Sequence, residues 1–435
     1  MHLLLTLAYS LLFIFLIGKM KFFRLPGISV GLLQSGFIIK LFAGIAVGLI
    51  YTYYYTDRLT ADTFKFFDDS AVLFNAMYVN QADYWRMLTG IGASSPELQH
   101  YYDTMTNWYD TFSPFNDNRT MIRLNAFLRL FSMGNYYVHV TVVCFLSYAG
   151  IVGIIKVFNR EYVNISKGIF IAFLLLPSVL FWGSGLLKDA LVFFSFGMVV
   201  FNFDRILHAQ KLSGLHLLYF IISFFLLMMT KFQVFLISIP LLAAWGVTHR
   251  LRSNPMLTFS IVSGVFILIM FLVSRTWPRL DVINLLVQKQ QSFFKLAEDA
   301  GAGSLIAIPV LENTISSMII NAPVGFFTSL TRPFITDSGA VLNTVSAIEN
   351  SLILLAGLYC LFNFRKENVR GKILPVFCLF YTLYSFTLIG MITPVLGAIV
   401  RYKAQALPFM VVLFIIIAHP AMKKIVDKFI PKSII

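Results

Sequence analysis

The stretch Leu176-Pro-Ser-Val-Leu-Phe-Trp-Gly-Ser-Gly-Leu-Leu-Lys-Asp189 lies between two apolar runs of the chain. One proline and two glycines inside it interrupt helix at the place where a membrane span would end. Trp182 is a residue type that settles at the level of the lipid headgroups. The last two residues, Lys188 and Asp189, open the next apolar run. The stretch therefore predicts a membrane protein whose chain turns back at this point.

Two interpretations of the charges in this stretch stay open. In the first, Lys188 and Asp189 pair with each other or reach the interface, and the glycines only form a tight turn. In the second, a broken turn presents a cation, a carboxylate and free backbone N–H groups to an anionic substrate. A charge deep in lipid costs about 2.5–3.5 kcal/mol on insertion scales, so charges beside a span usually have a partner or a function.

The composition predicts an all-α, polytopic integral membrane protein. Hydrophobic residues make up 58% of the chain and charged residues only 12%. Because about 20 apolar residues cross a bilayer, we expect about eleven transmembrane helices in a single membrane domain over 1–435. The predicted spans are 3–17, 30–54, 135–157, 168–182, 186–203, 214–229, 232–248, 256–274, 346–363, 373–393 and 399–418. Residues 304–330 form an additional hairpin or re-entrant piece that is not assigned to a span.

The net charge of +14 does not indicate a nucleic-acid partner, because the basic residues cluster in short loops between spans. If the loop after the first span is cytoplasmic, every short basic loop falls on the same side, as the positive-inside rule requires. The N-terminus is then predicted outside and the C-terminus in the cytoplasm. The residues of these loops and of the tail are Lys19, Lys21, Arg24, Arg160, Lys167, Arg205, Lys211, Arg250, Arg252, Arg365, Lys366, Arg370, Lys372, Lys423, Lys424, Lys428 and Lys432.

The same topology places two large loops, about 55–134 and 275–345, on the outer side. Within them, 118–134 and 282–300 have apolar residues at helical spacing. Both segments are predicted to be helices that lie on the membrane surface. These helices either shape the mouth of a site that is reached from the bilayer or are ordinary interfacial packing. The sequence supports the two alternatives equally.

Two adjacent carboxylates, Asp68 and Asp69, lie in the first outer loop. Adjacent residues point in different directions on a helix or a strand, so the two do not flank one bond as a glycosidase pair does. One of them can act as a general base on a sugar hydroxyl, while the other orients it or holds a cation. The alternative is that Asp69 caps the N-terminus of a helix that follows it.

Five cations are predicted near the outer ends of spans, on the side that the positive-inside rule disfavours. Converging cations suit a phosphate or pyrophosphate group. The alternative is that each cation snorkels individually to the membrane–water interface. Glu349 is a candidate structural partner for one of them. Neither the seven histidines nor the three cysteines have metal-ligand spacing. The cations are Lys188, Lys231, Arg332, Arg401 and Lys403.

Three stretches of the chain resemble a known family. Phe181–Asp189, Thr331-Arg332-Pro333-Phe334 and the Pro394…Gly397…Arg401-Tyr402 stretch are similar to the O-antigen and exopolysaccharide polymerases of bacteria and, more broadly, to membrane glycosyltransferases that use lipid-linked sugars. The resemblance implies an enzyme at the outer face of the bacterial inner membrane, with an acidic base in the first outer loop. It also implies that outer-face arginines handle the pyrophosphate.

The resemblance and the residues together lead to one main hypothesis. The protein is expected to join saccharide units carried on polyprenyl pyrophosphate, with Asp189 holding Lys188. The expected catalytic residues are Asp68, Asp69, Lys188, Asp189, Arg332 and Arg401, and the expected substrate-binding residues are Trp182, Ser184, Lys231, Glu349, Tyr402 and Lys403. No cofactor is implied, and a divalent cation stays open without being indicated.

Two other hypotheses stay open. The first is a flippase for lipid-linked oligosaccharides or another transporter, which should have charges near the midplane and an internal repeat. The second is a non-catalytic subunit of a polysaccharide-export complex, which should tolerate the loss of single outer-face charges. In each case the expected partners are membrane lipid, a polyprenyl-linked saccharide, and a chain-length regulator or export proteins.

Overall fold

The computed structural model describes residues 2–59, 61–108, 117–211, 213–277, 281–299, 304–337 and 341–419. These residues form helices and contain no β-strand. Within them, eight helices are long and apolar enough to cross a membrane, or nine if the bent pair α18 (Leu396–Lys403) and α19 (Leu407–Ile417) is one span. The prediction of an all-α polytopic membrane protein is confirmed.

The long apolar helices coincide with predicted spans. The run 214–229 is the shorter α11 (Gly214–Thr230), and the run 168–182 is divided between α8 (Ser166–Leu174) and α9 (Pro177–Trp182). This division has a physical cause, because a proline fits the first turn of a helix and not its interior. The long helices are α1 (His2–Lys19), α2 (Val30–Tyr53), α7 (Tyr136–Asn159), α10 (Lys188–His208), α12 (Phe232–Leu251), α13 (Pro255–Thr276), α16 (Val341–Phe362) and α17 (Ile373–Ile392).

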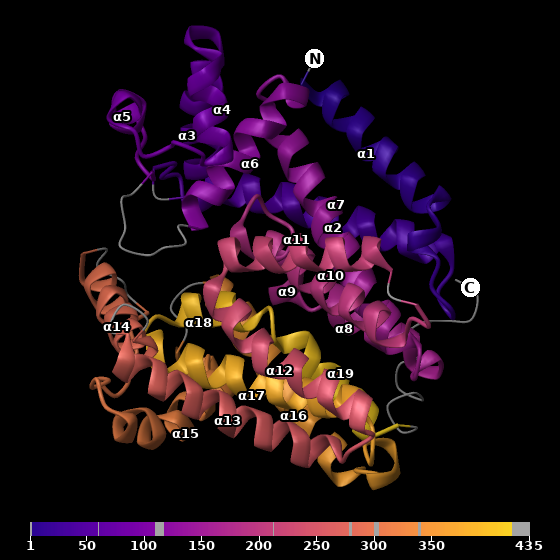
Figure 1. Ribbon diagram of the computed structural model, residues 1–435. Coiled ribbons are helices and arrows are strands. Elements are labelled where there is room, and N and C mark those ends of the chain that lie inside the picture. The colour runs from indigo at the N-terminus through magenta and orange to yellow at the C-terminus, as the bar shows by residue number, and fades with distance from the viewer. Residues whose placement is uncertain are drawn as a thin grey trace. The chain divides into compact units, whose positions relative to one another are not determined.

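The chain forms two compact units, each of which is described by itself. In its described part, the first unit comprises 2–161 and 180–235, and the second comprises 162–179 and 236–419. The single membrane domain predicted over 1–435 stays a prediction. In Figure 1 the first unit runs from indigo through magenta to the pink of α11, and most of the second unit is rose to yellow. Helix α8, drawn in magenta, belongs to the second unit.

The first unit is built around the crossing of α7 and α10, which lie side by side. Gly150 and Gly197 meet at this crossing, where an added Cβ on Gly197 would lie closer than 3.0 Å to the carbonyl oxygen of Gly150. Small residues let two membrane helices approach closely enough for backbone contact. The pair therefore sets the distance between the two most buried helices of the unit.

The loop of about 55–134, which the sequence predicts on the outer side, folds as a helical cap within this unit. Its helices are α3 (Asp62–Val79), α4 (Gln81–Thr89), α5 (Gln99–Tyr102) and α6 (Asp117–Ser132). Helix α6 packs against α3, and together they bury Phe66, Leu73, Met121 and Ile122. The cap is thus a packed structure with its own apolar core.

The second unit contains a similar glycine contact. Helix α15 (Ile315–Thr331) crosses α17, and an added Cβ on Gly390 would lie closer than 3.0 Å to the carbonyl oxygen of Gly325. Helix α14 (Val282–Asp299) packs on α17 as well. Its buried Gln290 donates to the carbonyl oxygens of Pro309 at 2.9 Å and Met391 at 2.6 Å.

The two segments predicted as surface helices are helical, as α6 and α14. On α6, Phe127 and Phe131 are exposed. Arg123, on the same helix, contacts the protein and donates to the carbonyl oxygen of Met87 on α4. That either helix lies on a membrane stays a prediction. Residue 300, at the end of the second predicted segment, and the basic tail from Lys423 lie outside the described residues.

Candidate functional site

The twelve candidate residues are distributed over both units. The first unit carries Asp68, Asp69, Trp182, Ser184, Lys188, Asp189 and Lys231, and the second carries Arg332, Glu349, Arg401, Tyr402 and Lys403. The convergence of all five cations on one substrate stays a prediction.

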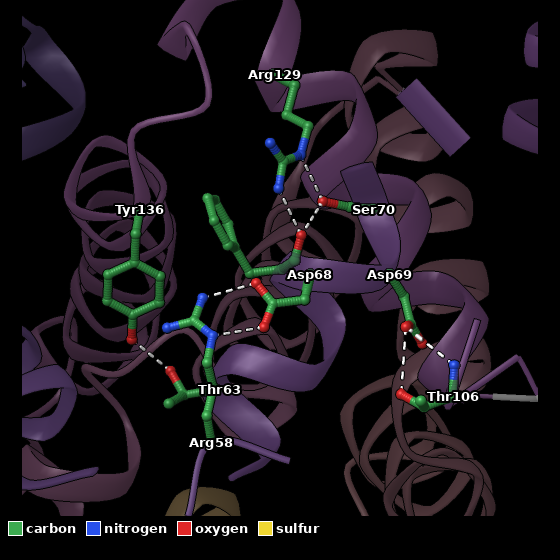
Figure 2. A network of polar contacts seen from close by, with 9 residues as sticks. Arg58, Thr63, Asp68, Asp69, Ser70, Thr106, Arg129 and Tyr136 are labelled. Atoms are coloured by element: carbon green, nitrogen blue, oxygen red, sulfur yellow. Dashed lines mark hydrogen bonds and ion pairs between the residues drawn. The ribbon is translucent and has the colours of Figure 1, made fainter. Parts of the chain in front are cut away.

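The two adjacent carboxylates on α3 point in different directions, as predicted. Figure 2 shows Asp68 held by Arg58, with two hydrogen bonds of 2.7 Å. Asp69 is only 5% exposed and accepts from the backbone N–H groups of Thr106 at 3.1 Å and Asn107 at 2.8 Å. The alternative that Asp69 caps the start of a helix is wrong, because α3 begins at Asp62 and Asp69 lies inside it.

This difference predicts unequal effects on stability. We expect Asp69→Ala to lower the free energy of unfolding by about 1–3 kcal/mol, because it leaves buried N–H groups without an acceptor. Asp68→Ala should cost about 1 kcal/mol or less, because its pair with Arg58 is largely exposed. Denaturation of the purified protein in detergent, followed by circular dichroism, measures both. Equal losses would contradict the assignment of Asp69 as the structural carboxylate.

Lys188 begins α10 and makes contacts with the cap. Its ammonium group lies 2.9 Å from Asp117 Oδ1, donates to Asn118 Oδ1, and lies 5.1 Å from the centre of the Phe66 ring. The expectation that Asp189 holds Lys188 is wrong. Asp189 instead accepts from Lys231 at 3.2 Å, in a pair that is almost fully buried. The helix start favours this arrangement, because a carboxylate in the first turn interacts well with the helix dipole.

Asp69 and Lys188 belong to one chain of hydrogen bonds, which we call the Lys188 network. Asp69 accepts from the N–H of Asn107, and the carbonyl oxygen of Asn107 accepts from Asn118 at 3.4 Å. Asn118 accepts in turn from Lys188. The sequence therefore identified both ends of a connected group, but neither asparagine between them.

Within the part of the chain that the structure describes, the ammonium group of Lys188 has acceptors for two of its donors. A lysine has three N–H donors, and the described partners of Lys188 are the two acceptors on Asp117 and Asn118. Its side chain is 17% exposed. A partly buried cation can bind an anionic oxygen, and the low local polarity strengthens that interaction.

The turn before α10 contains Trp182 and Ser184. Trp182 ends α9, and its ring meets Phe181 edge to face at 4.9 Å. The hydroxyl group of Ser184 is buried and accepts from Lys40 at 3.3 Å. In the structure Ser184 is thus turned toward the interior of its unit, and its role in binding a substrate stays a prediction.

Lys403 in the second unit uses all three of its donors within the protein. It donates to Asn350 Oδ1 at 2.6 Å and to the carbonyl oxygens of Arg332 at 2.7 Å and Ser329 at 3.3 Å. Lys403 therefore holds the end of α15 against α16. Its role as a substrate ligand stays a prediction.

Arg332 is held by Asp337, which follows five residues later. Burial raises the pKa of the Asp337 carboxyl, but hydrogen bonds from Arg332 and from the N–H of Phe334 outweigh this effect and hold the pKa below its ordinary value. Asp337 is therefore ionised at neutral pH, and an anionic ligand of Arg332 has to compete with it.

The other candidates of the second unit have different partners. Arg401 and Tyr402 lie in the last turn of α18, and the Tyr402 ring lies 6.0 Å from that of Phe293. Glu349 accepts from the N–H and hydroxyl groups of Ser178. The start of α9 thus provides the hydrogen-bond donors of Glu349, while Lys403, one of the five cations, interacts with Glu349 electrostatically. The expectation that Glu349 is a structural partner of one of the cations stays a prediction.

Sequence reasoning missed Lys40 and Gln290, although each left a signal. Lys40 is the single charged residue in the apolar run 30–54, and Gln290 is a polar residue on a helix face whose other members are apolar. Asp117 and Asn118 gave no comparable signal. Among the residues that the structure describes, no group of three or more His, Cys, Asp or Glu side chains is arranged to hold a metal ion.

Comparison of the chain with protein-family models, with curated proteins and with solved structures finds no match. The class that the fold defines is therefore that of a polytopic, all-α membrane protein.

Proposed function

We propose that the protein is a membrane glycosyltransferase of the polysaccharide-polymerase type. It would join saccharide units carried on polyprenyl pyrophosphate at the outer face of a bacterial inner membrane. The observation that carries the proposal is Lys188, a partly buried cation at the start of a membrane helix, with two acceptors for its three N–H donors among the described residues. The resemblance of Phe181–Asp189 to such polymerases supports the same class.

The reaction assigns a role to each of two residues. The hydroxyl oxygen of the acceptor sugar forms a bond to the anomeric carbon of the donor, and the bond from that carbon to the phosphate oxygen breaks. The leaving pyrophosphate takes the electron pair, and Lys188 stabilises its growing negative charge. We assign the acceptance of the hydroxyl proton to Asp68, which is partly exposed and has to exchange its contact with Arg58 for the acceptor sugar, whereas the carboxylate of Asp69 is buried and held by backbone N–H groups.

Arg332 and Arg401 belong to the second unit, and their role as cations for the pyrophosphate stays a prediction. Asp337 occupies one guanidinium nitrogen of Arg332, so an anionic ligand shares this arginine with a carboxylate. This competition favours a ligand that carries more than one negative charge.

The test is complementation of a strain that lacks the gene. We expect Lys188→Ala and Asp68→Asn to abolish the surface polymer while single lipid-linked units accumulate at the outer face. Lys65→Ala and Asp83→Asn are matched controls from the same cap, because each removes one member of a partly exposed ion pair. Membrane levels of every variant are measured by immunoblotting.

Two results would contradict the proposal. If the lipid-linked precursor stays at the inner face in cells with Lys188→Ala, the protein is a transporter. If both variants make normal polymer, the charges of the first unit have a structural role, as expected for a non-catalytic export subunit.

A further inference from the structure

A group of side chains that the proposed function does not use holds the turn before α10, which we call the Gly183–Gly185 turn. Lys40, from the middle of α2, is 0% exposed. Its ammonium group donates to the carbonyl oxygen of Gly183 at 2.6 Å and to the hydroxyl oxygen of Ser184 at 3.3 Å. A single lysine thus contacts two consecutive residues of a turn that is 143 positions away in the chain.

Two side chains of α7 contact the same turn. Ser147 donates to the carbonyl oxygen of Gly183 at 2.8 Å, and the thiol of Cys144 donates to that of Ser184 at 2.7 Å. The turn also lies directly on α2, because an added Cβ on Gly44 would be closer than 3.0 Å to the carbonyl oxygen of Ser184. The backbone carbonyls of 183 and 184 are therefore both occupied by side chains of α2 and α7.

Such contacts are needed because the turn is not helical. Non-helical backbone at membrane depth is tolerated only where its polar groups find partners inside the protein. Serine and cysteine supply such partners without a charge. A lysine is the costly choice, since an ionised side chain in a span costs about 2.5–3.5 kcal/mol on insertion scales. Among the described residues, no carboxylate forms an ion pair with Lys40.

The turn leads directly to the candidate site. The N–H of Leu187 donates to the carbonyl oxygen of Gly185 at 2.8 Å, and α10 begins at the next residue, Lys188. A displacement of the turn therefore moves Lys188 away from Asp117 and Asn118. Only Leu186 and Leu187 lie between the turn and Lys188, and both are fully buried, so packing opposes a local rearrangement that would absorb the displacement.

We propose that Lys40 is a positioning residue, which holds the Gly183–Gly185 turn and thereby fixes Lys188 at the start of α10. The part of this proposal that concerns anion binding by Lys188 rests on the proposed function, whereas the hold on the turn does not. Lys40 itself does not contact the substrate, because its ammonium group is fully buried.

The test uses Lys40→Met, which keeps the length of the side chain and removes its donors. The chain has three cysteines, and replacing Cys360 and Cys378 by alanine leaves Cys144 as the single thiol. We expect Lys40→Met to raise the rate of maleimide labelling of Cys144 about tenfold, because the turn no longer covers it. We also expect the Kd for inorganic pyrophosphate, measured by calorimetry on the purified protein, to rise about tenfold, equivalent to about 1.4 kcal/mol.

Lys156→Met is the matched control. Lys156 is a lysine of the same unit, in the last turn of α7, and its ammonium group contacts the Phe22 ring at 5.3 Å instead of the turn. Labelling and affinity should keep their original values in this variant. If Lys40→Met is not inserted, the double variant Ser147→Ala with Ser184→Ala replaces it, because it removes two polar side chains from the same cluster and keeps Lys40.

The outcomes separate the two proposals. Unchanged labelling of Cys144 in Lys40→Met would overturn the hold on the turn. Faster labelling with an unchanged Kd would show that Lys40 only stabilises the unit, which would overturn its positioning role. Failure of the original protein to bind pyrophosphate would overturn the proposed function, while the labelling experiment would still decide whether Lys40 holds the turn.

Discussion

Replacing Gly197 by valine is expected to prevent the first unit from forming its packed structure. An added Cβ at this position lies closer than 3.0 Å to three backbone atoms of Gly150. A flexible side chain can move away from such a contact, but a helix backbone cannot move without separating α10 from α7. The substitution therefore acts on the whole crossing and not on one contact.

The expected loss is large. Extra methyl groups in a well-packed core typically cost about 1–3 kcal/mol and occasionally more, and backbone contact places this case at the upper end. The close approach of two helices through small residues is also what holds membrane helices together in the absence of a hydrophobic driving force. We expect little Gly197→Val protein in the membrane, and a lower melting temperature for the part that is purified.

Gly264→Val is the matched control, because it places the same side chain in another membrane helix. Gly264 lies in α13, and an added Cβ there meets nothing within 4 Å. Its melting temperature in detergent should stay within about 2 °C of the original, since surface substitutions usually change stability by about 0.5 kcal/mol or less. Equal losses for both variants would contradict the role of the Gly150–Gly197 contact.

The glycine crossing illustrates what the sequence could predict about the fold. Long apolar runs separated by basic loops predict membrane helices because the bilayer imposes their length and the positive-inside rule their loops. The break at Pro177 was visible for an equally local reason. Which two helices touch is not a local property, and neither Gly150 nor Gly197 stands out among the 26 glycines of the chain.

The candidate site shows the same limit. Lys188 and Asp69 could be selected from the sequence because charged residues beside or between apolar runs need a reason. Their partners could not be selected, because those are set by tertiary packing between segments far apart in the chain. Asn107 and Asn118 are ordinary loop and helix-end residues until α6 packs on α3 and brings them to Lys188.

The pairing of the adjacent charges was wrong for a geometric reason. Consecutive residues at the start of a helix point about 100° apart, so Lys188 and Asp189 face different elements. Lys188 faces the cap, and Asp189 faces Lys231, which lies between α11 and α12. A pair of neighbouring opposite charges in a sequence is therefore a better indication of two ion pairs than of one.

The buried pair of Asp189 and Lys231 is the second place where a single substitution should have a large effect. Asp189→Asn and Lys231→Met each remove one charge of this ion pair and keep the other. Removing one member of a buried ion pair costs about 3–5 kcal/mol, whereas replacing both members is often nearly neutral. We therefore expect either single variant to lose most of the stability of the first unit, and the double variant to recover at least half of the summed loss.

A double-mutant cycle measures this directly, with the free energy of unfolding of the original protein, both single variants and the double variant determined in detergent. A coupling energy of about 3 kcal/mol is expected, which is the upper end of the range of about 0.5–3 kcal/mol found for residues in contact. Asp62 and Lys65 supply the control cycle, because their charged groups lie 3.9 Å apart and are more exposed. Coupling there should be about 0.5 kcal/mol.

If the two cycles give the same coupling, Asp189 and Lys231 are held by their other contacts and the ion pair itself contributes little. A large coupling in the first cycle alone would mean that this ion pair ties the start of α10 to the junction of α11 and α12.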